Sequence, residues 1–282
     1  AYNMGYVSFN DYDEWNGFLN YEIHRIYDKT ENWTDRHGEA SPDTPGNYSY
    51  TASASGAALE IRLDREADGI DHHINGFYIY HTAGPGYGEY QISVNGQVIT
   101  SVDCDAAENQ VCARSPYIEI PEGLGYEITI EIVKLSADDQ VTITGISYID
   151  QPDTLTVNNY SLSGIRLIDI DDEVLREISR ANVVLFTLGT NDAGTEADIN
   201  EFQRKLNVVV EACRENGSVL VVGDVIWDRY GDASWATPYK DALQKAAEAA
   251  NGYFIDFTTI GNDKILDEAN DISHPTYEGH RY

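Results

Sequence analysis

The hydrophobic pattern of the chain changes near residue 150, and this change limits the possible folds more than any other feature. From 46 to 150, short runs of alternating apolar and polar residues are separated by turn residues, a pattern typical of antiparallel strands. After residue 150, apolar strand-like runs alternate with segments of helical periodicity, which predicts a parallel sheet covered by helices. A length of 282 residues also fits two domains. We therefore expect an all-β part followed by an α/β part.

The segment from 46 to 150 is expected to form a β-sandwich of jelly-roll type, because its strands are short and no helical pattern lies among them. Asn95-Gly96 between two alternating runs predicts a two-residue hairpin. Residues 1–45 are rich in Asn, Asp, Tyr and Trp and have weak periodicity. We expect them to form loops and short strands that pack on the domain after residue 150. Strands are predicted at 58–63, 76–81, 89–94, 117–120 and 126–133.

The segment from 151 to 282 is expected to be an α/β domain whose parallel sheet is covered on both faces. Thr237-Pro238 predicts a helix start, because Thr is a favourable N-cap and Pro suits the first helical position. Cys213 falls on the apolar face of a helix and is expected to be buried. Strands are predicted at 154–157, 183–188, 219–227 and 253–257, and helices at 171–180, 199–216 and 237–250.

Two motifs follow predicted strands, where ligands bind in such sheets. Val183–Asp192 reads VVLFTLGTND, an apolar strand that runs into a Gly-x-Asn-Asp turn. Asp271–His280 reads DISHPTYEGH and places Asp271 three residues before His274. A side-chain amide can donate to the negative oxygen that forms on attack at an ester, and an Asp–His pair can activate a hydroxyl. The motifs supply most of the groups of a serine esterase, except the serine.

These motifs resemble the conserved blocks of the SGNH (GDSL-type) hydrolases. Asn159–Gly164 (NYSLSG) resembles the second block, Gly189–Asp192 (GTND) the third and Asp271–Pro275 (DISHP) the fourth, in family order. The resemblance covers roughly residues 151–282. It implies an SGNH-type three-layer α/β/α fold with a parallel sheet, into which the all-β jelly-roll sandwich is inserted.

The resemblance also implies a role for each matched residue. His274 would be the general base, and Asp271 would orient its imidazole ring. Asn191 would donate its side-chain amide to the oxyanion, and Gly164 its backbone N–H. Asp192 is interpreted as structural, through hydrogen bonds within its turn. Neither a cofactor nor a metal is expected.

The nucleophile is missing from the matched blocks, because no Gly-Asp-Ser occurs in the chain. In the family it precedes the second block, and the predicted sandwich occupies that interval. The chain begins without Met and stops directly after the fourth block, so both ends are interpreted as cut. We expect the serine to lie upstream of Ala1. Ser8, in the sequence Gly5–Asp11 (GYVSFND), is the best candidate within the chain.

Charge and cysteine content limit the partners. The chain carries 18 basic and 48 acidic residues, for a net charge of −30, which disfavours nucleic acid and anionic membranes as partners. No apolar run reaches the roughly 20 residues needed to span a bilayer. The acidic runs Asp103–Asp105 and Asp169–Asp172 are interpreted as a solvated loop and a helix N-terminus. Cys104 and Cys112 bracket a short loop and either pair or stay free; zinc is not indicated.

The aromatic content favours a glycan substrate. The chain has 20 Tyr and 4 Trp, and Trp15, Trp33 and Tyr87 lie in predicted loops where a ring can stack on a sugar. An esterase with a jelly-roll attachment resembles carbohydrate esterases that remove O-acetyl groups from polysaccharides. Bacteriophage tail spikes combine this domain with an inserted sandwich. That resemblance implies an acetylated polysaccharide or oligosaccharide substrate, a homotrimer and an extracellular or virion-surface location.

Two other functions remain open from the sequence. One is a non-catalytic glycan-binding module on a degenerate hydrolase scaffold, which is favoured if no serine reaches His274. The other is a lipase or thioesterase of the same family. The polar residues Asp228, Arg229 and Asp232 near the motifs argue against a groove for long acyl chains.

Overall fold

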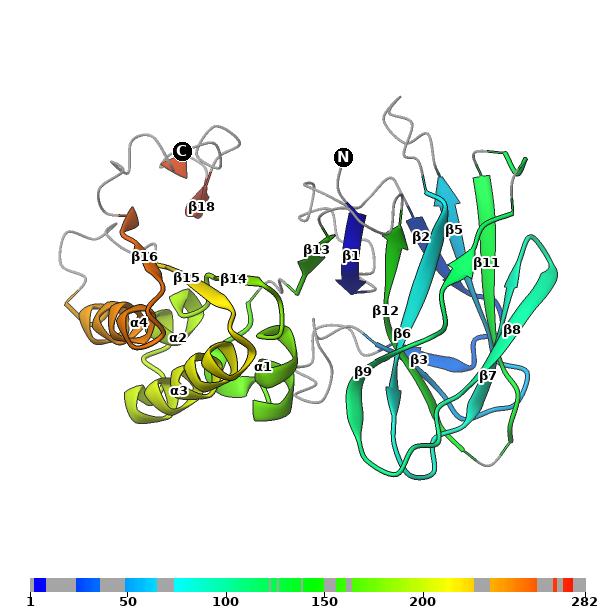
Figure 1. The fold of residues 1–282 in the computed structure, drawn as a ribbon, viewed down its shortest axis with the longest axis horizontal. Helices are drawn as coiled ribbons and strands as arrows, with labels where there is room; N and C mark the ends of the chain where they lie inside the picture. The colour runs from blue at the N-terminus through cyan, green and yellow to red at the C-terminus, as the bar shows by residue number, and fades with distance from the viewer. Residues whose placement is uncertain are drawn as a thin grey trace. The chain divides into compact units, whose positions relative to one another are not determined.

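The structure is a computed structural model. It describes residues 3–8, 24–35, 49–64, 74–121, 123–125, 127–137, 139–149, 156–160, 164–225, 234–257, 266–267 and 271–275. The chain divides into two compact units, Ala1–Leu162 and Ser163–Tyr282, each of which is described by itself (Figure 1). No helix in the part of the chain that the structure describes is long and apolar enough to cross a membrane.

The first unit consists of two mostly antiparallel β-sheets (Figure 1). One sheet has the order β10-β6-β12-β1-β13, with β9 paired to β6, β4 paired to β12 and β3 paired to β4. The other has the order β2-β5-β11-β7-β8. The strands are β1 (Asn3–Ser8), β2 (His24–Asp28), β3 (Trp33–Asp35), β4 (Tyr50–Ala52), β5 (Ala58–Asp64), β6 (Gly76–Ala83), β7 (Glu89–Val94), β8 (Gln97–Asp103), β9 (Gln110–Arg114), β10 (Ile118–Glu119), β11 (Glu127–Lys134), β12 (Val141–Ile149) and β13 (Thr156–Asn159).

A single apolar core joins the two sheets. Ile79 and Ile143 of one sheet and Ile61, Ile92 and Ile130 of the other belong to it, and all five are fully buried. In β11, every second side chain is buried, because successive side chains of a strand point to opposite faces. The unit is therefore a two-layer β-sandwich, and its jelly-roll connectivity stays a prediction.

Local sequence signals in this unit agree with the structure. The five predicted strands correspond to β5, β6, β7, β10 and β11. Asn95 and Gly96 connect β7 to β8 and have φ angles of 47° and 79°, as a two-residue hairpin turn requires. Strand β12 was not predicted. All nine of its residues are buried, so it lacks the alternation that marks a half-exposed strand.

The first 45 residues differ from their prediction in the strands that the structure describes. Strand β1 pairs with β12 and β13, β2 pairs with β5, and β3 pairs with β4. These strands thus belong to the sandwich, which extends on both sides of the expected range 46–150. Strand pairing uses backbone groups that almost every residue possesses. These strands therefore pair although their side chains show only weak periodicity, and the side-chain pattern did not predict the pairing.

Several smaller predictions are settled by the described side chains. Trp33 is buried in the sandwich core and Tyr87 packs against it, so Trp33 offers no ring for sugar stacking; Trp15 lies outside the described residues. Cys104 and Cys112 form no disulfide with each other, which rules out the pairing alternative. Asp105 accepts a hydrogen bond from the Gly86 backbone N–H at 2.9 Å, so this acidic run forms part of a turn.

The second unit is α/β, as predicted. Its sheet is parallel, with the order β14-β15-β16, and helices α3 and α4 pack against it (Figure 1). A β17–β18 hairpin forms a separate small sheet. The elements are the 3-10 helix η3 (Leu167–Asp169), α1 (Asp172–Ile178), β14 (Val183–Phe186), α2 (Thr190–Gly194), α3 (Ile199–Asn216), β15 (Val219–Gly223), α4 (Thr237–Ala249), β16 (Tyr253–Ile255), β17 (Leu266–Asp267) and β18 (Asp271–Pro275).

The two faces of the parallel sheet differ in burial. Alternate side chains on one face are buried, namely Val184, Phe186, Leu220 and Val222. On the other face, Leu185 is 75% exposed and Tyr253 is 66% exposed. No helix of the described ranges covers these two side chains, so the second helical layer of the predicted three-layer fold stays a prediction.

Helix α3 begins and ends where local chemistry requires. The Asp198 side chain accepts a hydrogen bond from the Asn200 backbone N–H at 2.9 Å, which satisfies one N–H of the first turn. Gly217 ends the helix in the left-handed conformation at φ 69°. Cys213 on this helix is fully buried, as predicted.

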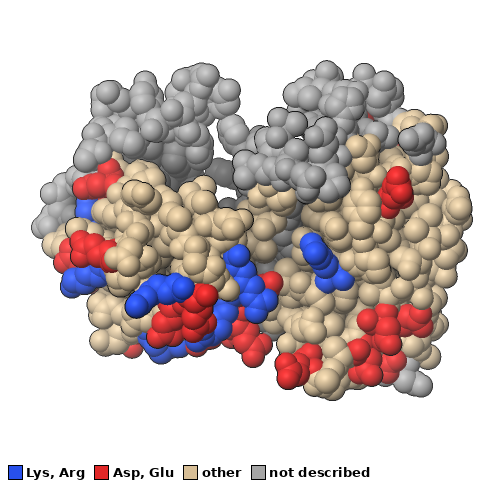
Figure 2. All heavy atoms as spheres, viewed as in Figure 1, with Lys and Arg blue, Asp and Glu red and all other residues tan. Residues whose placement is uncertain are grey.

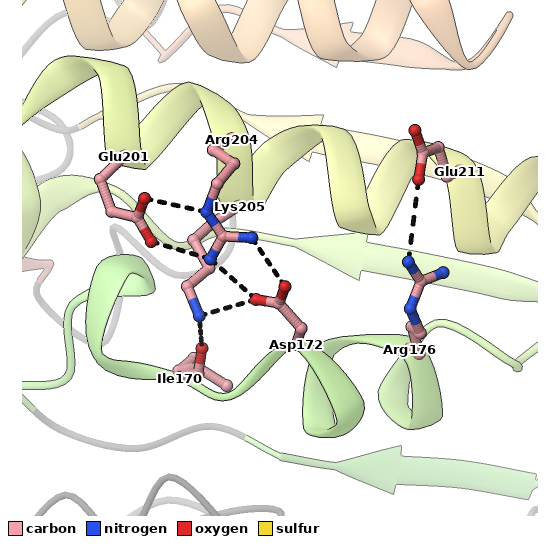
Figure 3. Close-up of polar contacts among 7 residues, drawn as sticks. All are labelled: Ile170, Asp172, Arg176, Glu201, Arg204, Lys205 and Glu211. Atoms are coloured by element: carbon pink, nitrogen blue, oxygen red, sulfur yellow. Dashed lines mark hydrogen bonds and ion pairs between the residues drawn. The ribbon is translucent and has the colours of Figure 1, made fainter.

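Helix α1 is joined to α3 by charged side chains (Figure 3). The Asp172 carboxylate accepts hydrogen bonds from Arg204 at 2.6 and 2.9 Å and from Lys205 Nζ at 2.8 Å. Glu201 binds the same guanidinium from within α3. Hydrogen bonds from Arg204, with further help from Lys205, hold the pKa of Asp172 well below its usual range although partial burial opposes them. Arg176 and Glu211 approach only to 3.8 Å between exposed side chains.

Acidic and basic side chains adjoin on the surface of this unit, while acidic side chains dominate the sandwich on the face shown in Figure 2.

The Asp172 cluster predicts a pH-dependent loss of stability. Asp172→Asn should lower the free energy of unfolding by about 0.5–1 kcal/mol at neutral pH, as for well-formed exposed ion pairs. The folded-state pKa is depressed, so the contribution is present above the unfolded pKa and is lost as the pH falls. The difference from wild type should therefore shrink below about pH 4. Urea unfolding followed by the helical circular dichroism signal measures it. Glu211→Gln is the matched control, and equal losses in the two variants would contradict the prediction.

Candidate active site

The turn after β14 needs a glycine at its first position. Gly189 caps α2 with φ at 127°, a region that favours glycine. A Cβ atom there would lie 3.1 Å from the ring of Phe202 and 3.3 Å from Leu243. The glycine thus lets the chain turn tightly at the carboxyl end of β14. This turn places Asn191 and Asp192 in the first residues of the short helix α2.

Asp192 joins this turn by hydrogen bonds to the segment around Leu167 and Ile168, which lies earlier in the chain. Its side chain is fully buried, and it accepts hydrogen bonds from the backbone N–H groups of Leu167 at 2.8 Å and Ile168 at 3.2 Å. Burial raises the pKa of this carboxyl, while the backbone N–H donors oppose the rise. The residue was expected to bond within its own turn. It is structural, but it bonds across to the segment that follows Gly164.

Asn191 contacts Ile165, the residue that follows Gly164 in the sequence. The Asn191 side-chain amide donates to the Ile165 carbonyl oxygen at 3.0 Å, and Ile165 directly follows Gly164. Gly164 is exposed, with φ at 79° and open space where a Cβ atom would stand. An amide group has two N–H donors, so Asn191 keeps one for a ligand while the other holds the Ile165 carbonyl. The structure thus places Asn191 against the residue that follows Gly164, and the joint oxyanion role of Asn191 and Gly164 stays a prediction.

The segment after Ile165 is also held from α3. Leu167 is fully buried, and the Ile170 carbonyl accepts a hydrogen bond from Lys205 Nζ. Arg166 donates to Asp169 at 2.7 and 2.8 Å. Together with the hydrogen bonds of Asp172, these contacts hold the stretch 165–172, which directly follows Gly164.

The ends of the next two strands carry a charged cluster that the sequence reading missed. Asp224 follows β15 and Asp256 follows β16, and Lys240 Nζ lies 2.8 Å from the first carboxylate and 2.9 Å from the second. The pKa of Asp224 is raised by burial, which Lys240 opposes. Burial lowers the pKa of Lys240, but hydrogen bonds to both carboxylates outweigh it and raise the pKa. An acidic residue inside the apolar run VVGDV was the available signal. The cluster ties α4 to the carboxyl edge of the sheet.

The predicted acid–base pair lies in a strand. Asp271 and His274 belong to β18, which pairs with β17 so that Asp267 is opposite Asp271 and Leu266 opposite Pro275. The backbone at these residues forms a strand that is paired antiparallel to β17. The side chains of Asp271 and His274 lie outside the described residues. Their mutual hydrogen bond and their distance from Asn191 therefore stay predictions.

Ser8 is the last residue of β1, a strand that pairs with β12 on one side and β13 on the other. In β12 its partner is Gly145, and in the parallel neighbour β13 the residue Asn159 lies opposite Val7. Ser8 therefore ends its strand beside the start of the Asn159–Gly164 block. The Ser8 side chain is outside the described residues.

The buried carboxylate predicts a specific loss of stability. Asp192→Asn should lower the free energy of unfolding by about 1–3 kcal/mol, because an amide NH2 group cannot accept from a backbone N–H and leaves it unsatisfied. Urea unfolding of the full chain, followed by the helical signal, measures this loss. Asp169→Asn removes an exposed ion pair in the same stretch and should cost less. A variant of Asp192 as stable as the Asp169 variant would contradict the anchoring role.

Residues 147–282 match the model of the GDSL-like Lipase/Acylhydrolase family. This part of the chain belongs to that family. The GDSL-like domain contains the three matched blocks, which confirms the resemblance drawn from them. The match supports a hydrolase of the esterase type. It begins inside β12, a few residues before the expected boundary at 151. No curated protein matches the chain.

Solved structures show weaker likenesses to the GDSL-like domain and the chain around it. The psychrotrophic esterase EstA from Pseudoalteromonas sp. is 16% identical, with 44% of this chain and 69% of that chain covered and a TM-score of 0.34. The salicylyl-acyltransferase SsfX3 is 14% identical, with 92% and 94% covered and a TM-score of 0.33. A family two carbohydrate esterase from Clostridium thermocellum is 13% identical, with 83% and 88% covered and a TM-score of 0.29. With scores this low, the assignment rests on the family match.

Proposed function

We propose that this protein is a serine esterase that removes O-acetyl groups from a polysaccharide. The observation that carries the proposal is the hydrogen bond from the Asn191 side-chain amide to the carbonyl of Ile165, the residue that follows Gly164. Two N–H donors in one place suit the negative oxygen of a tetrahedral intermediate. The membership of residues 147–282 in an acylhydrolase family supports the same reaction class.

The proposed reaction has two halves. In the first, His274 takes the proton of the serine hydroxyl, the serine oxygen attacks the acetyl carbonyl carbon, and Asp271 stabilises the imidazolium. Asn191 and the Gly164 N–H bind the oxyanion, and each donor contributes roughly 3–4 kcal/mol to transition-state stabilisation. The intermediate collapses, His274 protonates the departing sugar oxygen, and an acetyl-enzyme remains. In the second half, water attacks the acetyl group by the same route and releases acetate.

The substrate class rests on composition and on the attached sandwich. The tyrosine-rich chain and the polar sequence near the motifs favour a small acyl group on a sugar over a long acyl chain. By the resemblance to bacteriophage tail spikes, we extend the proposal to a homotrimer in the extracellular medium or on a virion surface. Light scattering on the purified protein measures the trimer, and a monomeric mass would remove that part of the proposal.

The oxyanion role predicts a loss of turnover. Asn191→Ala should lower kcat for p-nitrophenyl acetate by about 10²–10³-fold with little change in KM, because the lost donor acts on the transition state. Steady-state kinetics on the full-length protein measure it. Glu211→Gln, an exposed variant on α3, is the control and should keep wild-type turnover. An Asn191→Ala enzyme with the wild-type kcat would contradict the assignment.

The nucleophile can be identified by covalent labelling. A fluorophosphonate should label one serine of the natural protein, and His274→Ala should abolish the labelling because the serine loses its base. Mass spectrometry of the labelled peptide distinguishes a serine upstream of Ala1, the expected site, from Ser8. Ser8→Ala gives an independent check, since labelling survives in that variant only if another serine reacts. Absence of labelling in a folded protein would favour the degenerate scaffold over the esterase.

A further inference from the structure

The sandwich carries a cluster of aromatic and cationic side chains on the face of β6 that points away from the core. Phe77 and Ile79 are buried in the core, so the alternating residues Tyr78 and Tyr80 lie on the opposite face. Arg114 of β9 is the cross-strand partner of Tyr80. Side chains from neighbouring strands therefore meet on this face.

Two of these side chains, Tyr78 and Arg114, form a cluster with Tyr117. The Arg114 guanidinium lies over the ring of Tyr78, with its carbon 4.6 Å from the ring centroid. The rings of Tyr78 and Tyr117 are 5.5 Å apart between centroids and inclined by 56°. Tyr117 is 40% exposed and Arg114 is exposed as well. We call Tyr78, Arg114 and Tyr117 the tyrosine–arginine cluster.

The backbone beneath Tyr117 is shaped to receive its ring. A Cβ atom at Gly76 would lie 2.3 Å from both Cζ and the hydroxyl oxygen of Tyr117, far inside contact distance. The ring thus lies directly against the strand at a position where only glycine leaves room. Tyr117 is held in place before a ligand arrives, which lowers the conformational entropy that binding would cost.

The charge of the cluster distinguishes it from a similar stack elsewhere in the sandwich. Arg62 also lies over a tyrosine ring, 4.5 Å from the centroid of Tyr27, but its Nε is 2.7 Å from Glu60. Arg114 forms no ion pair with a carboxylate among the described residues, and within the sheet it contacts the Tyr78 ring and the Tyr80 hydroxyl. A guanidinium group has five N–H donors, so Arg114 retains donors for a ligand.

We propose that the tyrosine–arginine cluster binds a neutral glycan, with the sugar ring against Tyr117 and its hydroxyl or ester oxygens on Arg114. The aromatic face supplies apolar area for the C–H face of a sugar, and the guanidinium supplies in-plane donors. A neutral ligand is favoured over an acidic one because the chain carries a net charge of −30 and Glu119 lies beside Tyr117. The inference rests on the proposed function for its substrate class. It assigns the sugar contact to residues other than the predicted candidates Trp33 and Tyr87.

Affinity electrophoresis of the full chain tests the site without turnover. The gels contain O-acetylated glucomannan, O-acetylated xylan or, as the acidic probe, polygalacturonate. We expect a neutral polysaccharide to retard the wild type, and Tyr117→Ala to weaken binding about tenfold through the lost ring contact. Arg114→Gln should weaken binding too, and Tyr117→Phe should preserve it. Tyr27→Ala removes the ring of the other stack and should bind like wild type.

The outcomes test the proposed glycan site separately from the proposed esterase activity. Circular dichroism confirms that the variants are folded, and Tyr117→Phe and Arg114→Gln retain most of the packing if Tyr117→Ala is unstable. Wild-type binding by Tyr117→Ala, or equal weakening in Tyr27→Ala, would overturn the site. Stronger retardation by polygalacturonate would overturn the neutral class. A protein that hydrolyses p-nitrophenyl acetate but binds none of the polysaccharides overturns this inference alone. One that binds them through the cluster but cleaves no ester overturns only the proposed function.

Discussion

The buried carboxylate of Asp192 is the contact on which the candidate active site depends. It accepts two backbone N–H groups, from Leu167 and Ile168, in a position without solvent. Both N–H groups belong to the short 3-10 helix η3, where few regular backbone partners exist. Because Asn191 precedes Asp192, the same anchor also sets the amide of Asn191 against the Ile165 carbonyl. A chain segment and the side chain of the proposed oxyanion donor are thereby positioned by one interaction.

The rest of the second unit supports that anchor from several sides. Asp172 joins α1 to Arg204 and Lys205 of α3, and α3 packs on the parallel sheet (Figure 3). At the neighbouring strand ends, Lys240 bridges Asp224 and Asp256. These are polar contacts at the rim of an apolar core, where a lost partner leaves a charge or an N–H group unsatisfied. The edge of the sheet is therefore held by specific side chains rather than by burial alone.

The sequence by itself determined the features that arise from local chemistry. Period-2 alternation located strands such as β5 and β11, and Asn95-Gly96 located a hairpin, because side-chain direction and turn conformation depend on neighbouring residues. Helical periodicity ended by Gly217 located α3. The Gly-x-Asn-Asp turn after an apolar strand marked Asn191 as a candidate oxyanion donor before any of its contacts was known. The family resemblance of the C-terminal part followed from such short motifs in their order.

Only the tertiary structure decided what depends on distant partners. The pairing of β1, β2 and β3 with later strands uses backbone groups, which carry no side-chain signal. A carboxylate such as Asp192 accepts whichever N–H groups the fold brings to it, and its partners lie about 25 residues away. Exposure is also a property of the whole fold. Trp33 was expected to be available for stacking but fills the core. Tyr117 is exposed next to Tyr78, and Gly76 leaves room for its ring.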